Sequence, residues 1–147
     1  MPVMEFETQI NAPPDRVFAY VADLEKHTEW THCEEIRKTS DGPVGVGTTY
    51  ASRGKNFGMT TKEAVEVTEY APNQRFSWRT SGAMGMKFNW SFELRPQDGG
   101  TLLIERLEPP KGVLPAIMGA LVGNRAARKQ VPEGLAKIKA TLESAGS

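Results

Sequence analysis

Residues 74–108 read QRFSWRTSGAMGMKFNWSFELRPQDGGTLLIERLE, and this stretch decides the fold. Phe76 and Trp78 share one parity of the first segment, and large apolar residues alternate with other residues from Met86 to Leu94. This is the period of a β-strand. Short links, at 81–82 and at Pro96–Gly100, separate the segments and are typical of antiparallel hairpins. The stretch therefore predicts three strands of an antiparallel meander.

Working outward, the N-terminal third predicts one strand over 4–10, where apolar and polar residues alternate, and two short helices. Pro13 and Pro14 suit a helix start, so we expect a first helix near 14–22, followed by a second piece from 24 to 29. Further strands are expected around Ile36 and near 47–53, 60–70, 74–81, 86–95 and 100–108. From Leu114 to Leu142 apolar residues recur every three or four positions, as in one long helix that Pro132 should kink or split. Strands grouped apart from helices predict an α+β fold in which a seven-stranded antiparallel sheet curves around the long C-terminal helix.

Composition narrows the function classes. The chain has 147 residues, the length of one domain, and its 18 basic and 18 acidic residues cancel, which argues against a nucleic-acid partner. The single cysteine allows no intrachain disulfide. The first ten residues lack the apolar core of a signal peptide, and the most apolar run, 113–123, is too short to span a bilayer. We expect a cytoplasmic protein without stable membrane insertion.

Large adaptable side chains are concentrated in one segment. Of the 18 Phe, Trp, Tyr and Met residues, seven lie between positions 76 and 92, while the facing helix carries small residues at Ala116, Gly119, Ala120 and Gly123. Either the helix approaches the sheet closely over a filled core, or the small residues leave room for an apolar binding cavity. The sequence leaves both interpretations open.

Few residues suggest chemistry. The glycine-rich 42–47 segment leads into a strand and not into the helix that a phosphate site needs. The segment from His27 to Glu35 has no metal-ligand spacing, so we expect its histidines and Cys33 at the surface or on loops, and we expect no metal and no cofactor. Arg125 lies seven residues after Met118 and thus faces the predicted cavity. Glu105 faces inward only if Leu103 and Leu107 do, because the other parity of this strand is also apolar.

Several segments resemble a known family: INAPPDRVFAYVADLEKHTEW (10–30), GPVGVGTTY (42–50), VTEYAPNQRFSWR (67–79), FELRPQDGGT (92–101) and LAKIKATLES (135–144). Together they are similar to the polyketide cyclase/dehydrase branch of the START-like (Bet v 1-like, SRPBCC) superfamily. The resemblance spans nearly the whole chain and implies a single START-like domain over 1–147, with the helix-grip fold and a deep apolar cavity between sheet and helix. Family members bind lipids, sterols or polyketides, and some catalyse ring closure or dehydration. They share no catalytic motif, so the resemblance transfers no catalytic residue.

Three functions follow as hypotheses. The first is the binding of a lipid- or polyketide-like molecule in the cavity by a monomer or homodimer; the second is a cyclase/dehydrase-type enzyme that uses polar groups such as Glu105 and Arg125; the third is a regulatory protein with a filled cavity. Glycine-bearing segments at 53–58, 82–85 and 111–115 are expected to form the mouth. The predicted ligand-binding residues are Trp30, Tyr50, Phe57, Trp78, Met84, Met86, Phe88, Trp90, Leu114, Met118, Leu121 and Val122.

Overall fold

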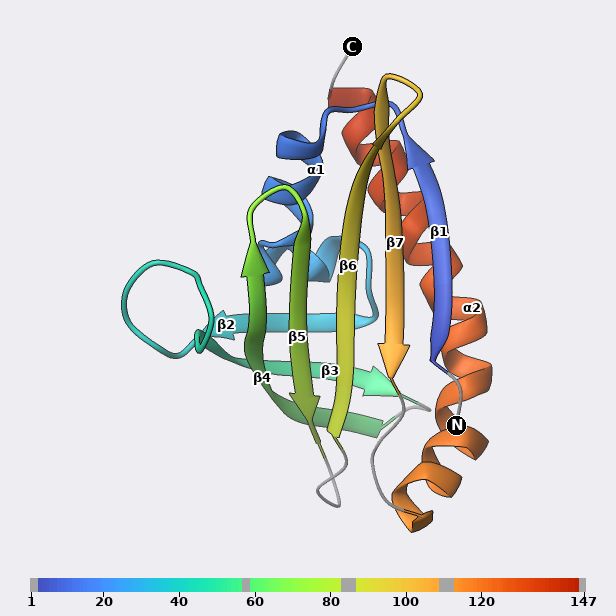
Figure 1. Cartoon of the computed structure of the whole chain (residues 1–147). Helices are drawn as coiled ribbons and strands as arrows, with labels where there is room; N and C mark the ends of the chain where they lie inside the picture. The colour runs from blue at the N-terminus through green and yellow to red at the C-terminus, as the bar shows by residue number, and fades with distance from the viewer. Residues whose placement is uncertain (1–2, 57–58, 83–86, 109–112, 146–147) are drawn as a thin grey trace.

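The fold is one curved sheet with helices on its concave side (Figure 1). The computed structural model describes residues 3–56, 59–82, 87–108 and 113–145, and of these it leaves out the side chains of 56, 59, 113–126 and 145. The elements follow in the order β1 (Met4–Ile10), α1 (Pro14–Val21), the 3₁₀ helix η1 (Leu24–Glu29), β2 (Cys33–Lys38), β3 (Thr49–Asn56), β4 (Met59–Ala71), β5 (Arg75–Ser81), β6 (Lys87–Gln97), β7 (Gly100–Glu108) and α2 (Val113–Ala145).

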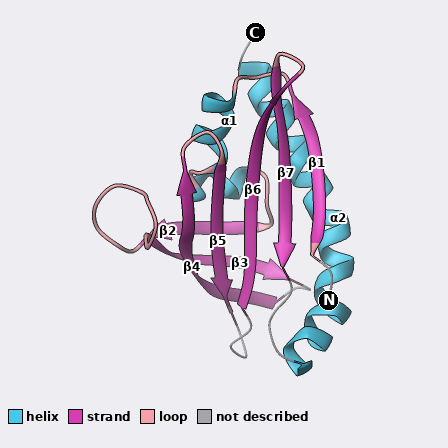
Figure 2. Ribbon diagram, viewed as in Figure 1, coloured by secondary structure: helices cyan, strands magenta, loops and turns pink. Residues whose placement is uncertain are grey.

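The seven strands form an antiparallel sheet in the order β1-β7-β6-β5-β4-β3-β2. Chain neighbours pair from β2 to β7, and β1 closes the sheet beside β7. Figure 2 shows β2 and β3 running almost across the direction of β5, β6 and β7, which is the mark of strong curvature. Two register shifts contribute to this curvature, because a bulge bends its own strand. They lie in β4 between Val67 and Glu69, and in β2 between Cys33 and Glu35.

Two turns have the backbone that their residues favour. Asp98 and Gly99 join β6 to β7 with φ values of 51° and 76°, the conformation of a two-residue hairpin that Asp-Gly suits. Gly47, with φ of 92°, ends the loop before β3, and the Thr48 hydroxyl accepts a hydrogen bond from the Gly45 amide. The sequence had predicted a strand start near residue 47. Because residues 45–48 belong to this loop, β3 begins at Thr49 instead.

The core lies between the sheet and α2. We call the sheet surface that faces α2 the inner face. Its buried residues come from six strands, and they share one cluster with the C-terminal part of α2: Ile10, Tyr50, Val65, Val67, Phe76, Trp78, Phe92, Leu94, Leu103, Leu107, Val131, Leu135, Ile138 and Leu142. The α+β, helix-grip architecture expected from the sequence is thus confirmed.

Pro132 does not split the last helix. It lies inside α2, which runs unbroken from Val113 to Ala145. Val131 and Leu135 flank the proline and both belong to the buried core. Tertiary packing on both sides of the proline therefore outweighs the hydrogen bond that the helix loses there.

Gly134 is the point where α2 meets Trp30. A Cβ at Gly134 would lie 2.9 Å from the Trp30 carbonyl oxygen and 3.1 Å from its Cε3. In an open helix, Gly→Ala stabilises by about 0.5–1 kcal/mol. Here we expect Gly134→Ala to lower the free energy of unfolding by about 1–3 kcal/mol, because the helix must move away from Trp30. Urea denaturation measures the change.

The control is Ala136→Gly, at an exposed position of the same helix. It should lower stability only by the ordinary helix-propensity difference, about 0.5–1 kcal/mol. A Gly134→Ala variant more stable than the wild-type protein would show that the contact with Trp30 is not tight.

Candidate functional site

The site is built on the inner face where β5, β6 and β7 lie side by side. Phe92 of β6 pairs with Phe76 of β5 on one side and with Glu105 of β7 on the other. Trp90, two residues along β6, pairs with Trp78 and Leu107 in the same way. Residues directly opposite each other in an antiparallel pair project from the same face, so these side chains form one continuous wall.

Aromatic rings make up most of this wall. The Trp78 and Trp90 rings stack with centroids 6.1 Å apart and an interplanar angle of 6°. Phe76 also stacks on Trp78, with centroids 5.5 Å apart. The wall therefore offers flat apolar surface, which suits an apolar ring or chain.

The helix η1 adds His27 and Trp30 to the wall. The His27 ring lies 4.4 Å from Trp30 and 5.2 Å from Trp78, and the Trp30 ring lies 5.8 Å from Phe92. The Asp23 carboxylate accepts a hydrogen bond from the Glu25 amide and so caps the start of η1. The cap fixes the turn that directs both rings inward.

His27 is buried, and the sequence-based placement of His27 at the surface or on a loop was wrong. It is 3% exposed, and its Nε2 donates a hydrogen bond of 2.8 Å to the Val21 carbonyl at the end of α1. Burial lowers the pKa of His27 to about 4. The ring is consequently neutral at pH 7, which its apolar neighbours require.

Glu105 is the carboxyl group of the inner face. Its side chain is 3% exposed, beside the buried Leu103 and Leu107, so the inward one of its two possible orientations is observed. It lies between Phe6 of β1 and Phe92 of β6 in the strand register. Burial among apolar groups raises the pKa of Glu105 to about 8, so the carboxyl is mostly protonated at pH 7.

Two buried polar atoms of this wall lack a partner within the described residues. They are the Oε1 atom of Glu105 and the indole Nε1 of Trp30. Most buried polar groups in proteins are hydrogen-bonded, so a pair of unpartnered atoms beside the same Phe92 ring calls for an explanation.

The inner face is closed at one end and less closed at the other. Phe76, Phe92 and Leu103 are buried beneath α1, η1 and the C-terminal part of α2. Toward the ends of β5, β6 and β7 at Ser81, Lys87 and Glu108, the apolar side chains of Phe88 and Trp90 are only partly buried. Exposure therefore increases along β6 in the direction of these strand ends.

The predicted ligand-binding residues fall into three groups. Trp30, Tyr50 and Trp78 are buried, and Phe88 and Trp90 pack partly buried against them. Burial is common to core residues and to residues that line an enclosed cavity, so their role stays a prediction. The third group lies outside the described side chains and comprises Phe57, Met84, Met86, Leu114, Met118, Leu121 and Val122, together with Arg125 and most of the expected mouth.

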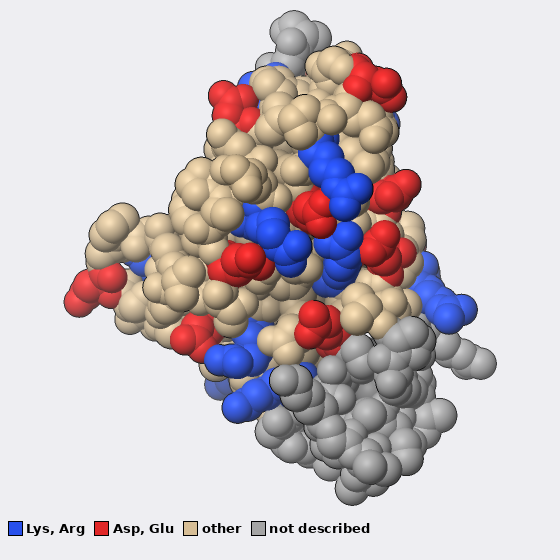
Figure 3. Space-filling view, viewed as in Figure 1, with Lys and Arg blue, Asp and Glu red and all other residues tan. Residues whose placement is uncertain are grey.

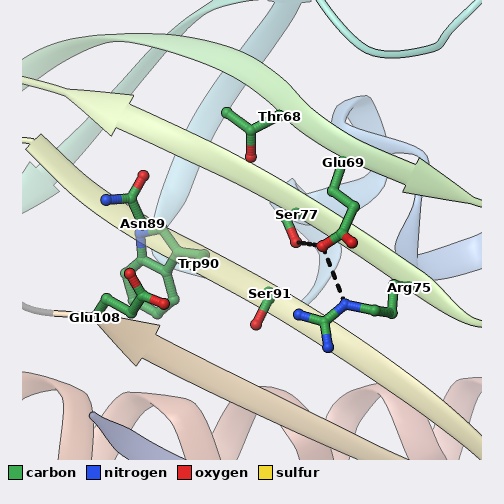
Figure 4. A pocket seen from close by; sticks show the side chains of 8 residues that line it. All are labelled: Thr68, Glu69, Arg75, Ser77, Asn89, Trp90, Ser91 and Glu108. Carbon is green, nitrogen blue, oxygen red and sulfur yellow. Dashed lines mark hydrogen bonds and ion pairs between the residues drawn. The ribbon is translucent and has the colours of Figure 1, made fainter. Parts of the chain in front are cut away.

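The outer face carries a hollow of about 340 Å³ that the sequence did not predict (Figure 4). Ser77 and Arg75 donate hydrogen bonds to the Glu69 Oε1 at its edge, at 2.9 and 3.0 Å, and the Ser77 bond is the main cause of the lowered pKa of Glu69. Figure 3 shows the same face covered by interspersed basic and acidic side chains. The polar residues that alternate along β5 and β6 indicated an outer face, but not that this face has a hollow in it. The lining residues are Thr68, Glu69, Arg75, Ser77, Asn89, Ser91 and Glu108, together with Trp90, whose ring stacks on Trp78 of the inner face.

In the described part of the chain, no three His, Cys, Asp or Glu side chains come together as metal ligands would. No helix there has the length and apolar character needed to cross a membrane.

The comparisons with known proteins agree with this geometry. Residues 1–143 match the family model described as polyketide cyclase / dehydrase and lipid transport. The chain belongs to this family. Its fold is shared with the Zhui aromatase/cyclase of Streptomyces sp. R1128, at a TM-score of 0.78 and 10% identity, over 99% of this chain and 96% of that one.

Two further members of the comparison have no stated activity. The polyketide-cyclase-like protein Cgl2372 of Corynebacterium glutamicum is 27% identical, with a TM-score of 0.63 over 100% of this chain and 96% of that one. The uncharacterized protein Rv0088 of Mycobacterium tuberculosis is 30% identical over 87 residues, which are 58% of this chain but only 38% of that protein. These relatives support the family and say nothing of a ligand.

The two titrating groups beside Phe92 predict an unusual pH dependence of stability. The lowered pKa of His27 means that its contribution is complete above pH 6.5 and is lost as the pH falls toward 4. The raised pKa of Glu105 means that stability falls as the pH rises from 4.5 to about 8, because only the unfolded chain ionises there. The two effects oppose each other between pH 4.5 and 6.5, and above 6.5 the Glu105 effect remains.

We therefore expect Glu105→Gln to gain stability relative to the wild-type protein as the pH rises from 4.5 to 8. The gain should approach about 1.4 kcal/mol per pH unit and level off above pH 8. Urea denaturation at several pH values measures it. Glu105→Leu should follow the same course, because it also removes the titration. If the free energy of unfolding of both variants changes with pH in the same way as that of the wild-type protein, Glu105 is not a buried, neutral carboxyl.

Proposed function

We propose that the chain binds an apolar small molecule, lipid- or polyketide-like, between the inner face of the sheet and α2. The observation that carries the proposal is the aromatic wall of β5 and β6, which is buried at one end and only partly buried at Phe88 and Trp90. The family, whose description includes polyketide cyclisation and lipid transport, supports the same class of ligand.

A core that served stability alone would not need aromatic side chains whose exposure increases toward one end of the wall. Trp78 is 5% exposed and touches rings on several sides, whereas Trp90, stacked parallel to it, keeps part of its surface accessible. Partly exposed aromatic side chains at the edge of an apolar wall are a common feature of ligand sites. A molecule lying against Trp90 would cover that surface and extend the stack by one ring.

An enzyme of the cyclase/dehydrase type is the second candidate, and Glu105 is the observation that favours it. A carboxyl group with a pKa near 8 can donate a proton at neutral pH. Glu63, a partly buried carboxyl of the inner face, lies on β4, three strands away from Glu105, which is about 14 Å at ordinary strand spacing. The Nε2 of His27 is already bonded to Val21. Glu63 is therefore too far away to share a proton with Glu105, and the described residues give more support to binding than to catalysis.

Substitution of Trp90 tests the proposal with the dye Nile red. We expect Trp90→Ala to weaken Nile red binding at least tenfold while it lowers the free energy of unfolding by no more than about 2 kcal/mol, because the ring is only partly buried. Trp78→Ala, at a buried position, should cost about 3–5 kcal/mol. Binding to the wild-type protein should show a negative heat-capacity change.

Ser91→Ala is the matched control. Ser91 is next to Trp90 on β6 but faces the outer hollow, so its loss should leave Nile red affinity unchanged. If Trp90→Ala leaves the affinity unchanged, or Ser91→Ala weakens it, the dye does not bind at the inner face and the proposal is wrong.

A further inference from the structure

Glu105 and Trp30 each bury a polar atom that has no partner in the described part of the chain. The cost of leaving such an atom unpaired is about 1–3 kcal/mol each. Two of them in one core are more than packing requires, since leucine and phenylalanine would fill similar volumes without that cost. A partner that is present only when the site is occupied would remove the cost.

The two groups flank a single ring. Glu105 is directly opposite Phe92 in the β6–β7 pair, and the Trp30 ring centroid lies 5.8 Å from that of Phe92. Trp30 is held in place from behind, where it packs against Gly134 of α2. The polar atoms therefore belong to one small region of the inner face and not to two separate defects.

This region adjoins the partly exposed end of the wall. Leu107, two residues from Glu105 along β7, is the cross-strand partner of Trp90. Two residues of a strand span about 7 Å, which is the length of one bicyclic aromatic ring system. A molecule lying against Trp90 can therefore place a substituent next to Glu105.

The two groups have one chemistry in common. A protonated carboxyl has an O–H donor, and an indole has an N–H donor and no acceptor. The carboxyl of Glu105 is in its protonated form at neutral pH because burial raises its pKa to about 8. A carbonyl oxygen has two lone pairs and can accept from both donors. A ligand carboxylate would bring a buried charge, and Glu105 has no cationic side chain as a partner within the described residues.

We infer that Glu105 and Trp30 form the polar end of the proposed ligand site and donate hydrogen bonds to a carbonyl oxygen of an uncharged, otherwise apolar ligand. The inference rests on the proposed function and narrows its ligand class to ketones and related carbonyl compounds. Glu105 and Trp30 then select among apolar molecules, while the aromatic wall binds them all.

The test compares two probes of nearly the same shape, 2-acetylnaphthalene and 2-ethylnaphthalene, of which only the first has a carbonyl group. Isothermal titration calorimetry gives the affinity of each for the wild-type protein, Glu105→Leu and Trp30→Phe. We expect the wild-type protein to bind the ketone at least tenfold more tightly than the hydrocarbon. Glu105→Leu and Trp30→Phe each remove one of the two donors, so each should show a reduced preference for the ketone, and all three proteins should bind 2-ethylnaphthalene with similar affinity.

A second readout reports the hydrogen bond itself. The C=O stretching band of bound 2-acetylnaphthalene should move to lower wavenumber in the wild-type protein than in Glu105→Leu. Glu63→Leu is the control, because this substitution removes an inner-face carboxyl three strands away and should leave both the preference and the band unchanged. Thermal unfolding of each variant shows that it is folded.

The outcomes separate the two proposals. Equal affinity of the wild-type protein for both probes, or a ketone preference in Glu105→Leu as large as that of the wild-type protein, overturns the inference and leaves the proposed function in place. Failure of both probes to bind contradicts the proposed function, and the inference with it.

Discussion

The packing around Phe92 holds the sheet, η1 and α2 together. Its ring lies within 6.5 Å of the rings of His27, Trp30 and Trp78, while Phe76 and Glu105 pair with it across the strands. Trp30 in turn fits against α2 only because position 134 is glycine. One fully buried ring thus joins the middle of the sheet to a short helix near the N-terminus and, through Trp30, to the long C-terminal helix.

The same packing accounts for the unusual titration of the site. Close aromatic neighbours exclude water from His27 and Glu105, so each group takes its neutral form: the histidine loses its proton and the glutamic acid keeps it. His27 satisfies its N–H at the Val21 carbonyl, whereas Glu105 and Trp30 have unpartnered atoms. These two unpartnered atoms are the observation on which the proposed polar end of the ligand site rests.

Much of the fold could be predicted because strand and helix periods, and turns such as Asp98–Gly99, are local signals. The orientation of Glu105 could not, since both faces of its strand carry leucine or isoleucine; the pairing with Phe6 and Phe92 decides it. The burial of His27 was missed because a 3₁₀ turn of six residues has no readable period. The continuity of α2 through Pro132 depends on packing by residues on both sides of the proline, which no local rule contains.

A crystal structure of the protein with 2-acetylnaphthalene tests the central claim most directly. We expect the naphthalene ring to lie on the inner face against Trp90, with the carbonyl oxygen of the acetyl group within hydrogen-bond distance of the Glu105 carboxyl. Electron density for the probe in the outer hollow beside Ser77 and Ser91, or on the inner face with its carbonyl turned away from Glu105, would contradict it.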